Sequence, residues 1–197
     1  REEAFGIHQA LAGAAAAYAN ARLAGHPVIG LIVGKAMSGA FLAHGYQANR
    51  LIAETNHQDC YRSFIYEPGT YKPLTQLEGK GKTAEVYYYH LDHLGTPQEL
   101  TNTNGKLVWA VQYRAYGNVV RTIANEIEAP LRFQGQYLDR EIGLHYNTFR
   151  FYDPDVGRFT TPDPIGLEGG INLYLYAANP YGWVDPLGWS CTSSINR

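Results

Sequence analysis

The sequence predicts a mainly β fold built from antiparallel hairpins, preceded by a short α/β piece in the order helix, strand, helix. The composition changes near residue 53: residues 1–53 contain 15 alanines and two tyrosines, whereas residues 54–197 contain seven alanines and 14 tyrosines. After that point, short aromatic and β-branched runs alternate with Gly, Pro, Asn and Asp turns, which is typical of strands. Before it, alanine-rich stretches flank one apolar run of strand length, which is typical of helices around a buried strand.

The first part of the chain predicts a helix over about residues 2–25, which Gly25-His26-Pro27 ends. The apolar run VIGLIV, residues 28–33, is dense enough for a buried parallel strand. A glycine turn then leads into a second predicted helix, over about residues 34–50.

The stretch LAGHPVIGLIVGKAMSGAFLAHGYQANRLIA, residues 23–53, resembles the gamma subunit of malonate decarboxylase. The resemblance covers about residues 1–53 and implies a crotonase-like fold. Most of that fold is missing, and a helix-strand-helix piece alone cannot bury its strand on both faces. We therefore expect no decarboxylase activity. An inactive fragment of a malonyl-thioester decarboxylase subunit, fused by accident, is one alternative for the whole chain.

The rest of the chain predicts a series of strands separated by turns. The hairpin that we expect most clearly joins residues 96–103 to residues 106–114, with Asn104-Gly105 in a type I′ turn. The predicted strands lie in the segments YRSFIYEPG, EVYYYHLD, KLVWAVQYRAYG, LHYNTFRFYD and NLYLYA. Alternate tyrosines in such strands are expected to line the inside of a sheet.

A weak repeat runs through this part: a tyrosine at a strand end, an aspartate in the turn, and a glycine that closes it. The aspartate can accept hydrogen bonds from its own turn and the glycine can adopt a left-handed conformation. Units of this kind stack side by side, because one hairpin cannot bury a core alone. The three copies are Tyr89-Asp92-Gly95, Tyr137-Asp139-Gly143 and Tyr152-Asp153-Gly157.

The segments YYYHLDHLGTPQELTNTNGKLVWAVQYRAYGNVV and PLRFQGQYLDREIGLHYNTFRFYDPDVGRFTTPDPIGLEGGINLYLYAANPYGWVDPLGW carry a second resemblance. Together with the preceding NRLIAETNHQDCYRSFIYEPGTYKPLTQLEG, they resemble the C-terminal end of the core of Rhs proteins, the bacterial YD-repeat family. The resemblance covers about residues 50–189. It implies that the hairpins form part of a hollow β shell, which encloses a variable C-terminal toxin.

The two resemblances predict three segments: a decarboxylase-like fragment at residues 1–53, the Rhs core at residues 54–189, and the start of a truncated toxin region at residues 190–197. The pentapeptide NRLIA, residues 49–53, fits both families, which indicates a gene fusion or an assembly error at a short similarity. Because the chain opens with Arg1, we expect it to be a fragment.

The tetrapeptide Asp-Pro-x-Gly occurs twice, at residues 163–166 and 185–188, with 18 residues between the copies. Two adjacent carboxyl groups cannot both ionise easily, so one keeps its proton while the other activates water. Asp163 and Asp185 are the predicted catalytic residues, with Arg158 placed to keep one carboxylate charged. The Rhs resemblance implies that this pair is an aspartyl autoprotease cutting between Trp189 and Ser190. The alternative is that both tetrapeptides only make turns within a structural or surface-interaction module.

Composition argues against nucleic-acid binding and against a zinc or disulfide framework. A net charge of −2 provides no basic surface for nucleic acid, and two distant cysteines make neither a disulfide framework nor a zinc site. The pair His90 and His93 around Asp92 has partial metal-ligand spacing, but hairpin residues are the favoured interpretation. We expect no cofactor, no metal, no membrane span and no signal peptide.

The Rhs resemblance also implies partners and a location. The expected partners are the chain's own C-terminal toxin segment, components of a secretion system, and an immunity protein that neutralises the toxin. The implied route is synthesis in the cytoplasm, followed by secretion or surface display through a specialised bacterial export system.

Overall fold

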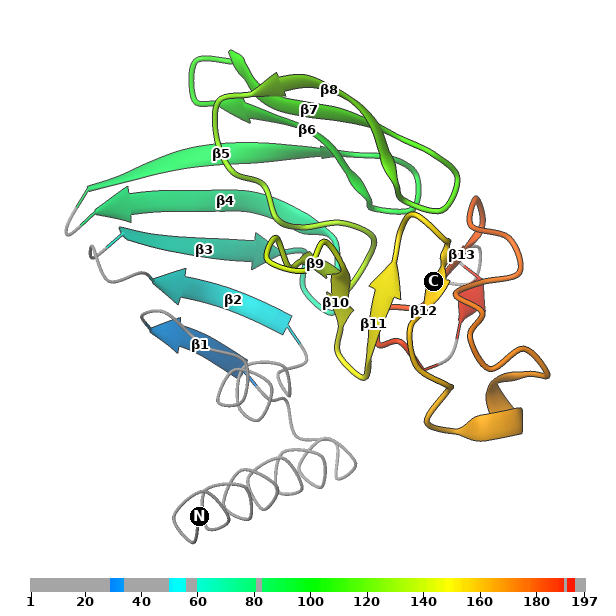
Figure 1. The fold of residues 1–197 in the computed structure, drawn as a ribbon. Helices are drawn as coiled ribbons and strands as arrows, with labels where there is room; N and C mark the ends of the chain where they lie inside the picture. Colours follow the sequence, from blue (N-terminus) through cyan, green and yellow to red (C-terminus); the bar gives the residue numbers. More distant parts are fainter. Residues whose placement is uncertain (1–28, 34–49, 56–59, 81–82, 190, 194–197) are drawn as a thin grey trace, which may run out of the picture. The chain divides into compact units, whose positions relative to one another are not determined.

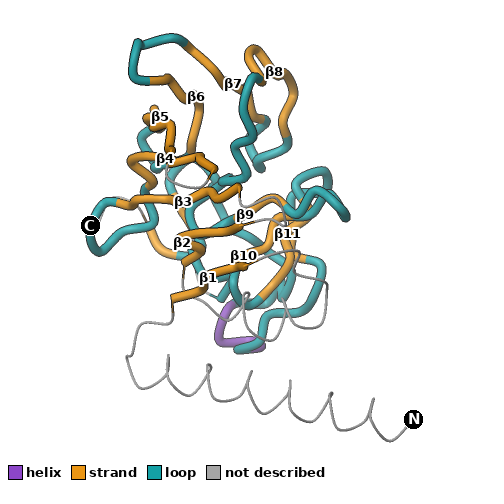
Figure 2. The backbone as a smooth tube through the Cα atoms, turned by 90° about the vertical axis from the view of Figure 1, so that its left-hand side faces the viewer, coloured by secondary structure: helices purple, strands orange, loops and turns teal. Residues whose placement is uncertain are grey.

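The structure is a computed structural model that describes residues 29–33, 50–55, 60–80, 83–189 and 191–193. Short strands and turns make up these residues, together with one 3-10 helix, Gly166–Gly169 (Figures 1 and 2). The prediction of a mainly β, antiparallel fold is confirmed. The two predicted helices lie outside the described residues, so the crotonase-like fold stays a prediction. Within the described part, no helix is long and apolar enough to cross a membrane.

The chain divides into two compact units. The first comprises Arg1–Phe64 and Leu77–Ala84, and the second comprises Ile65–Gln76 and Glu85–Arg197. The strand β4, Pro73–Lys80, contributes residues to both units. The predicted domain boundary near residue 53 stays a prediction.

Three strands lie in the first unit except for Ile65 and Tyr66: β1 (Ile29–Val33), β2 (Arg50–Thr55) and β3 (Cys60–Tyr66). β1 runs parallel to β2, with Ile29 opposite Arg50. β3 is antiparallel to β2, with Ser63 opposite Ala53. The prediction of a parallel strand is confirmed for Ile29–Val33, while the burial expected of this run stays a prediction.

Four strands form an antiparallel meander that lies in the second unit except for Thr83 and Ala84: β5 (Thr83–Leu91), β6 (Pro97–Asn102), β7 (Leu107–Tyr113) and β8 (Val119–Asn125). The tyrosines of β5 follow the two-residue period of a strand, because Tyr87 and Tyr89 are buried whereas Tyr88 is exposed. The buried hydroxyl of Tyr89 donates to Oε1 of Gln76 at 2.6 Å. The expectation that alternate tyrosines line one face is confirmed on this strand.

The hairpin of β6 and β7 is present, but its turn is not type I′. Gly105 has a φ of 77°, while Asn104 is not among the described non-glycine residues with positive φ. The N–H of Gly105 donates to the carbonyl of Asn102, which defines a type I turn followed by a left-handed glycine. Asn102 decides the turn, because its side-chain oxygen accepts from the N–H groups of Asn104 and Lys106 at 3.0 Å.

The three tyrosine-aspartate-glycine units form turns as predicted. In each, Oδ1 of the aspartate accepts a hydrogen bond from the N–H two residues later, and the glycine has a φ between 73° and 90°. The aspartate-to-amide contacts are Asp92 with Leu94 at 2.9 Å, Asp139 with Glu141 at 3.0 Å, and Asp153 with Asp155 at 2.9 Å.

The rest of the second unit holds shorter strands. One sheet has the order β12 (Arg158–Phe159), β11 (Arg150–Asp153), β10 (His145–Asn147) and β9 (Tyr137–Leu138). A second pairs β13 (Trp183–Val184) with β14 (Thr192–Ser193). Their core is aromatic: the ring of Tyr176 lies 5.0 Å from Tyr152, 5.5 Å from Phe133 and 5.9 Å from Phe159.

Two predicted strands differ from the structure. The segment LHYNTFRFYD is a hairpin, β10 and β11, rather than one strand. Residues 171–177, expected as a strand between the two Asp-Pro-x-Gly copies, form turns with a single bridge from Leu175 to Arg158. Asn172 favours turns over a strand here. Its side-chain oxygen accepts a hydrogen bond from the N–H of Tyr174, and its backbone carbonyl accepts one from the N–H of Leu175.

Candidate active site

Each Asp-Pro-x-Gly copy forms a turn of the same kind. Gly166 donates to the carbonyl of Asp163 at 2.9 Å, and Gly188 donates to that of Asp185 at 3.5 Å. Both glycines have positive φ, which explains why glycine occupies the fourth position. In each turn one carboxylate oxygen accepts a backbone N–H: that of Ile165 at 3.1 Å for Asp163, and that of Trp189 at 2.9 Å for Asp185.

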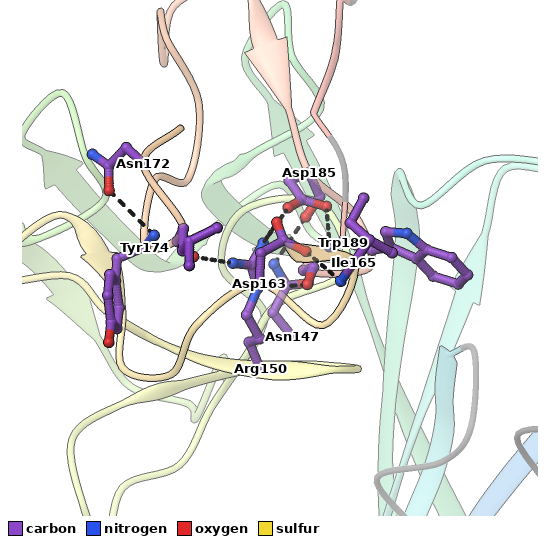
Figure 3. A network of polar contacts seen from close by, with 10 residues as sticks. Asn147, Arg150, Asp163, Ile165, Asn172, Tyr174, Asp185 and Trp189 are labelled. Carbon is purple, nitrogen blue, oxygen red and sulfur yellow. Dashed lines mark hydrogen bonds and ion pairs between the residues drawn. The ribbon is translucent and has the colours of Figure 1, made fainter. Parts of the chain in front are cut away.

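The second oxygen of each carboxylate contacts one shared cation. Nη2 of Arg150 lies 3.0 Å from Oδ2 of Asp163 and 3.4 Å from Oδ2 of Asp185 (Figure 3). Because both oxygens contact the same nitrogen, they lie no farther apart than the sum of these two distances. The Asp163 and Asp185 side chains are only 7% and 1% exposed, so the interaction is largely screened from water.

Arg150 also contacts groups other than the two carboxylates. It opens β11, where it and Tyr152 share the buried face of the strand. Its Nε donates to the carbonyl of Gly188 at 2.6 Å, and its Nη1 donates to that of Leu173 at 3.0 Å. Its guanidinium also stacks 3.6 Å from the centre of the Phe159 ring, which links the site to the aromatic core.

Burial shifts the pKa values of Asp185 and Arg150. Burial raises the pKa of Asp185 above its ordinary value, while the N–H of Trp189 and the Arg150 guanidinium oppose this rise. Burial lowers the pKa of Arg150, and Asp163 and Asp185 oppose that change. The guanidinium lies closer to Asp163 than to Asp185, at 3.0 Å against 3.4 Å.

The structure thus brings Asp163 and Asp185 together and places Arg158 elsewhere. On β12, Phe159 is buried and Arg158 is exposed, so the alternation of the strand turns Arg158 outward. Its guanidinium lies 4.5 Å from the ring centre of Tyr174. Trp189 adjoins the site through its N–H, whereas Ser190 lies outside the described residues.

Sequence reasoning missed Arg150. A usable signal was present: Arg150 stands two residues before Tyr152 in an aromatic strand, so the two share one face. A charged residue on a buried face needs a partner, and that requirement points to a site.

The two histidines around Asp92 have other partners. Nε2 of His90 lies 2.9 Å from the hydroxyl of Thr101, and Nε2 of His93 lies 2.8 Å from the carbonyl of Tyr181. The Asp92 carboxylate caps its own turn. The contacts of His90 and Asp92 stay within the β5–β6 hairpin, whereas His93 contacts a residue outside it. Cys60 and Cys191 are not joined in a disulfide.

Two protein families account for the sequence. Residues 1–103 match the malonate decarboxylase gamma subunit family, and residues 86–123 match the RHS protein family. The first match spans just over half of the chain, so the chain belongs to the malonate decarboxylase gamma subunit family, and the second match identifies an Rhs-type part. The decarboxylase match extends beyond residue 53 and shares residues 86–103 with the RHS match. In that overlap the structure has the β5–β6 hairpin and the Asp92 turn, which recurs through the Rhs part of the chain.

Relatives of the Rhs part carry toxin names. The chain is 44% identical over 161 residues to double-stranded DNA deaminase toxin A of Burkholderia cenocepacia (strain H111), covering 73% of this chain and 11% of that protein. It is 34% identical over 177 residues to toxin protein Tse5 of Pseudomonas aeruginosa, covering 73% of this chain and 13% of that protein. The chain therefore spans about a tenth of the length of these relatives.

A solved structure shares the Rhs part's fold. The crystal structure of TcdB2-TccC3 without its hypervariable C-terminal region matches with a TM-score of 0.57 and 25% identity. The match covers 66% of this chain and 6% of that one.

Proposed function

We propose that this chain is a C-terminal core fragment of an Rhs-type toxin delivery protein, and that it cleaves itself after Trp189. One observation carries the proposal: a single nitrogen of buried Arg150 contacts the carboxylates of both Asp163 and Asp185. Turns alone require the proline, the glycine and one carboxylate oxygen. They do not require that the second oxygens, from residues far apart in sequence, meet at one buried cation.

The proposed chemistry is hydrolysis by one charged and one protonated carboxyl group. Asp163, held charged by Arg150, takes a proton from a water molecule, whose oxygen attacks the carbonyl carbon of Trp189. Asp185, kept protonated by burial, donates its proton to the carbonyl oxygen. Protonated Asp163 then gives its proton to the nitrogen of Ser190 while Asp185 takes a proton back from one hydroxyl of the diol, and the carbon–nitrogen bond breaks. This leaves a carboxyl group on Trp189 and an amine on Ser190, and both aspartates return to their starting protonation states.

The wider assignment follows from the toxin relatives. Residues 54–189 form part of a shell around the toxin, and residues 190–197 begin the variable toxin segment. The partners are that segment, components of a secretion system, and an immunity protein specific to the toxin. The protein is made in the cytoplasm and reaches the cell surface or the exterior through a specialised bacterial export system.

A structural module without protease activity is the second candidate. The turn hydrogen bonds of both Asp-Pro-x-Gly copies favour it, because they explain each tetrapeptide without any chemistry. The decarboxylase family match supports a third: an inactive fragment of a malonyl-thioester decarboxylase subunit, joined by accident. A malonyl-thioester decarboxylation assay tests that reading, and we expect no turnover.

Intact mass after expression separates the first two candidates. Autoproteolysis predicts loss of residues 190–197 from the chain. Asp163→Asn and Asp185→Asn should each abolish that loss, because Asn keeps the shape of Asp without an ionisable proton. Asp153→Asn is the matched control, since Asp153 caps a turn in the same way outside the site. Cleavage of either site variant at the unsubstituted rate would show that the tetrapeptides are only turns.

A further inference from the structure

The tip of the β10–β11 hairpin is hydrogen-bonded to the segment that precedes the proposed cleavage point. Strand pairing ends at Asn147 opposite Arg150, so Thr148 and Phe149 form a two-residue tip. Three hydrogen bonds run from this tip to the backbone of residues 185–188: Asn147 Nδ2 to the carbonyl of Asp185 at 2.8 Å, the N–H of Phe149 to that of Leu187 at 3.0 Å, and Arg150 Nε to that of Gly188 at 2.6 Å.

The tip also contacts the side chain next to the proposed cut. The ring of Phe149 meets that of Trp189 edge to face, with centroids 5.0 Å apart and planes at 85°. Edge-to-face pairs of this kind are favourable beyond the area that they bury. The backbone hydrogen bonds are indifferent to side-chain type, so this ring contact is the one that can distinguish Trp189 from another residue.

The backbone of the tip is strained. Thr148 has a φ of 52°, and it is the one non-glycine residue with positive φ in the described part of the chain. A β-branched residue is a clear outlier there, and such a conformation persists only when its surroundings hold it. The contacts of Asn147 and Phe149 on either side supply that support. Strain of this kind clusters where a chain positions a reacting group.

We propose that the hairpin tip is the substrate-positioning clamp of the autoprotease and that Phe149 is its specificity-determining residue, selecting an aromatic side chain at position 189. The inference rests on the proposed function. The three hydrogen bonds hold the chain up to Gly188 in place. The Phe149 ring then orients Trp189 so that the following peptide bond is presented to Asp163 and Asp185.

The test compares cleavage rates for two residues at position 189 in two backgrounds. Chains carrying Trp189 or Trp189→Leu are made by cell-free synthesis, with Phe149 or Phe149→Leu, and cleavage is followed by intact mass over time. With Phe149 in place, Trp189 should be cut about 2- to 12-fold faster than Leu, the range that an aromatic pair contact supports. With Phe149→Leu the ratio should fall to about one, and Phe149→Tyr should restore it.

Phe151→Leu is the matched control. Phe151 is the other phenylalanine of this hairpin, and its ring lies 6.0 Å from that of Tyr146. This variant should leave the ratio between Trp and Leu unchanged, whatever it does to the absolute rate.

The possible outcomes distinguish failure of the clamp proposal from failure of the proposed autoproteolysis. If Phe149→Leu slows cleavage equally for Trp and for Leu at position 189, the tip is merely structural and the inference is overturned, while autoproteolysis stands. If the unsubstituted chain shows no loss of residues 190–197, the proposed function fails and the clamp fails with it. A ratio that collapses in Phe149→Leu, but not in Phe151→Leu, supports the proposal.

Discussion

Replacing Arg150 by methionine tests the electrostatics of the site directly. Methionine keeps an unbranched apolar stem but removes the charge and all the guanidinium donors. Two buried carboxyl groups then lose the cation that lies 3.0 Å and 3.4 Å from them. The carbonyls of Gly188 and Leu173 also lose their side-chain donors.

The size of the effect follows from burial. Removing one partner of a buried ion pair costs about 3–5 kcal/mol, because an uncompensated charge stays behind. When Asp163→Asn and Asp185→Asn are already present, no charge is stranded. Arg150→Met should then cost at most about 1–3 kcal/mol, the penalty for unsatisfied buried carbonyls, because it also removes a buried cation that the two Asn residues leave without a carboxylate. The difference between the two backgrounds isolates the charge contribution.

Urea unfolding followed by tryptophan fluorescence measures these free energies of unfolding. Only samples that intact mass shows to be uncleaved are compared. Arg158→Met is the control, since Arg158 is exposed and stacks on Tyr174. It should cost no more than about 1 kcal/mol. Equal losses for Arg150→Met and Arg158→Met, or equal losses in the two backgrounds, would refute the view that Arg150 compensates a buried carboxylate pair.

Three further predictions concern the site and its surroundings. Gly169→Ala should slow self-cleavage at least about 10-fold in the mass assay, because a Cβ there would lie 2.5 Å from Oδ2 of Asp163. Gly182→Ala is the control and should leave the rate unchanged, because its Cβ would have no neighbour closer than 3.9 Å. The cleavage rate should fall as pH rises, because Asp185 must stay protonated and burial raises its pKa; a rate that climbs with pH would contradict that role. Burial lowers the pKa of His145 to about 3 from 6.5, so the unfolded state binds a proton first on acidification. The free energy of unfolding should therefore fall by about 1.4 kcal/mol per pH unit between pH 6.5 and 3, and His145→Gln should flatten this dependence in urea titrations at several pH values.

Local chemistry explains why the turns were predictable. The aspartate-glycine units, such as Asp92 with Gly95, satisfy their hydrogen bonds within a few residues, so their conformation follows from neighbouring residues alone. The same holds for the strand pattern of β5, where a period of two buries alternate tyrosines. Where prediction failed locally, a nearby asparagine had been overlooked: Asn102 changes the hairpin turn, and Asn172 replaces an expected strand with turns.

The sequence by itself determined the mainly β class, the two families and the pair of aspartates that meet. Only the tertiary structure decided which cation meets them. Arg158 is five residues from Asp163, yet the alternation of β12 exposes it. Arg150 is farther away in sequence, and the burial of β11 turns it toward both carboxylates. The reason is that a turn closes over a few residues, whereas a buried charge is paired by whichever strand the sheet places beside it.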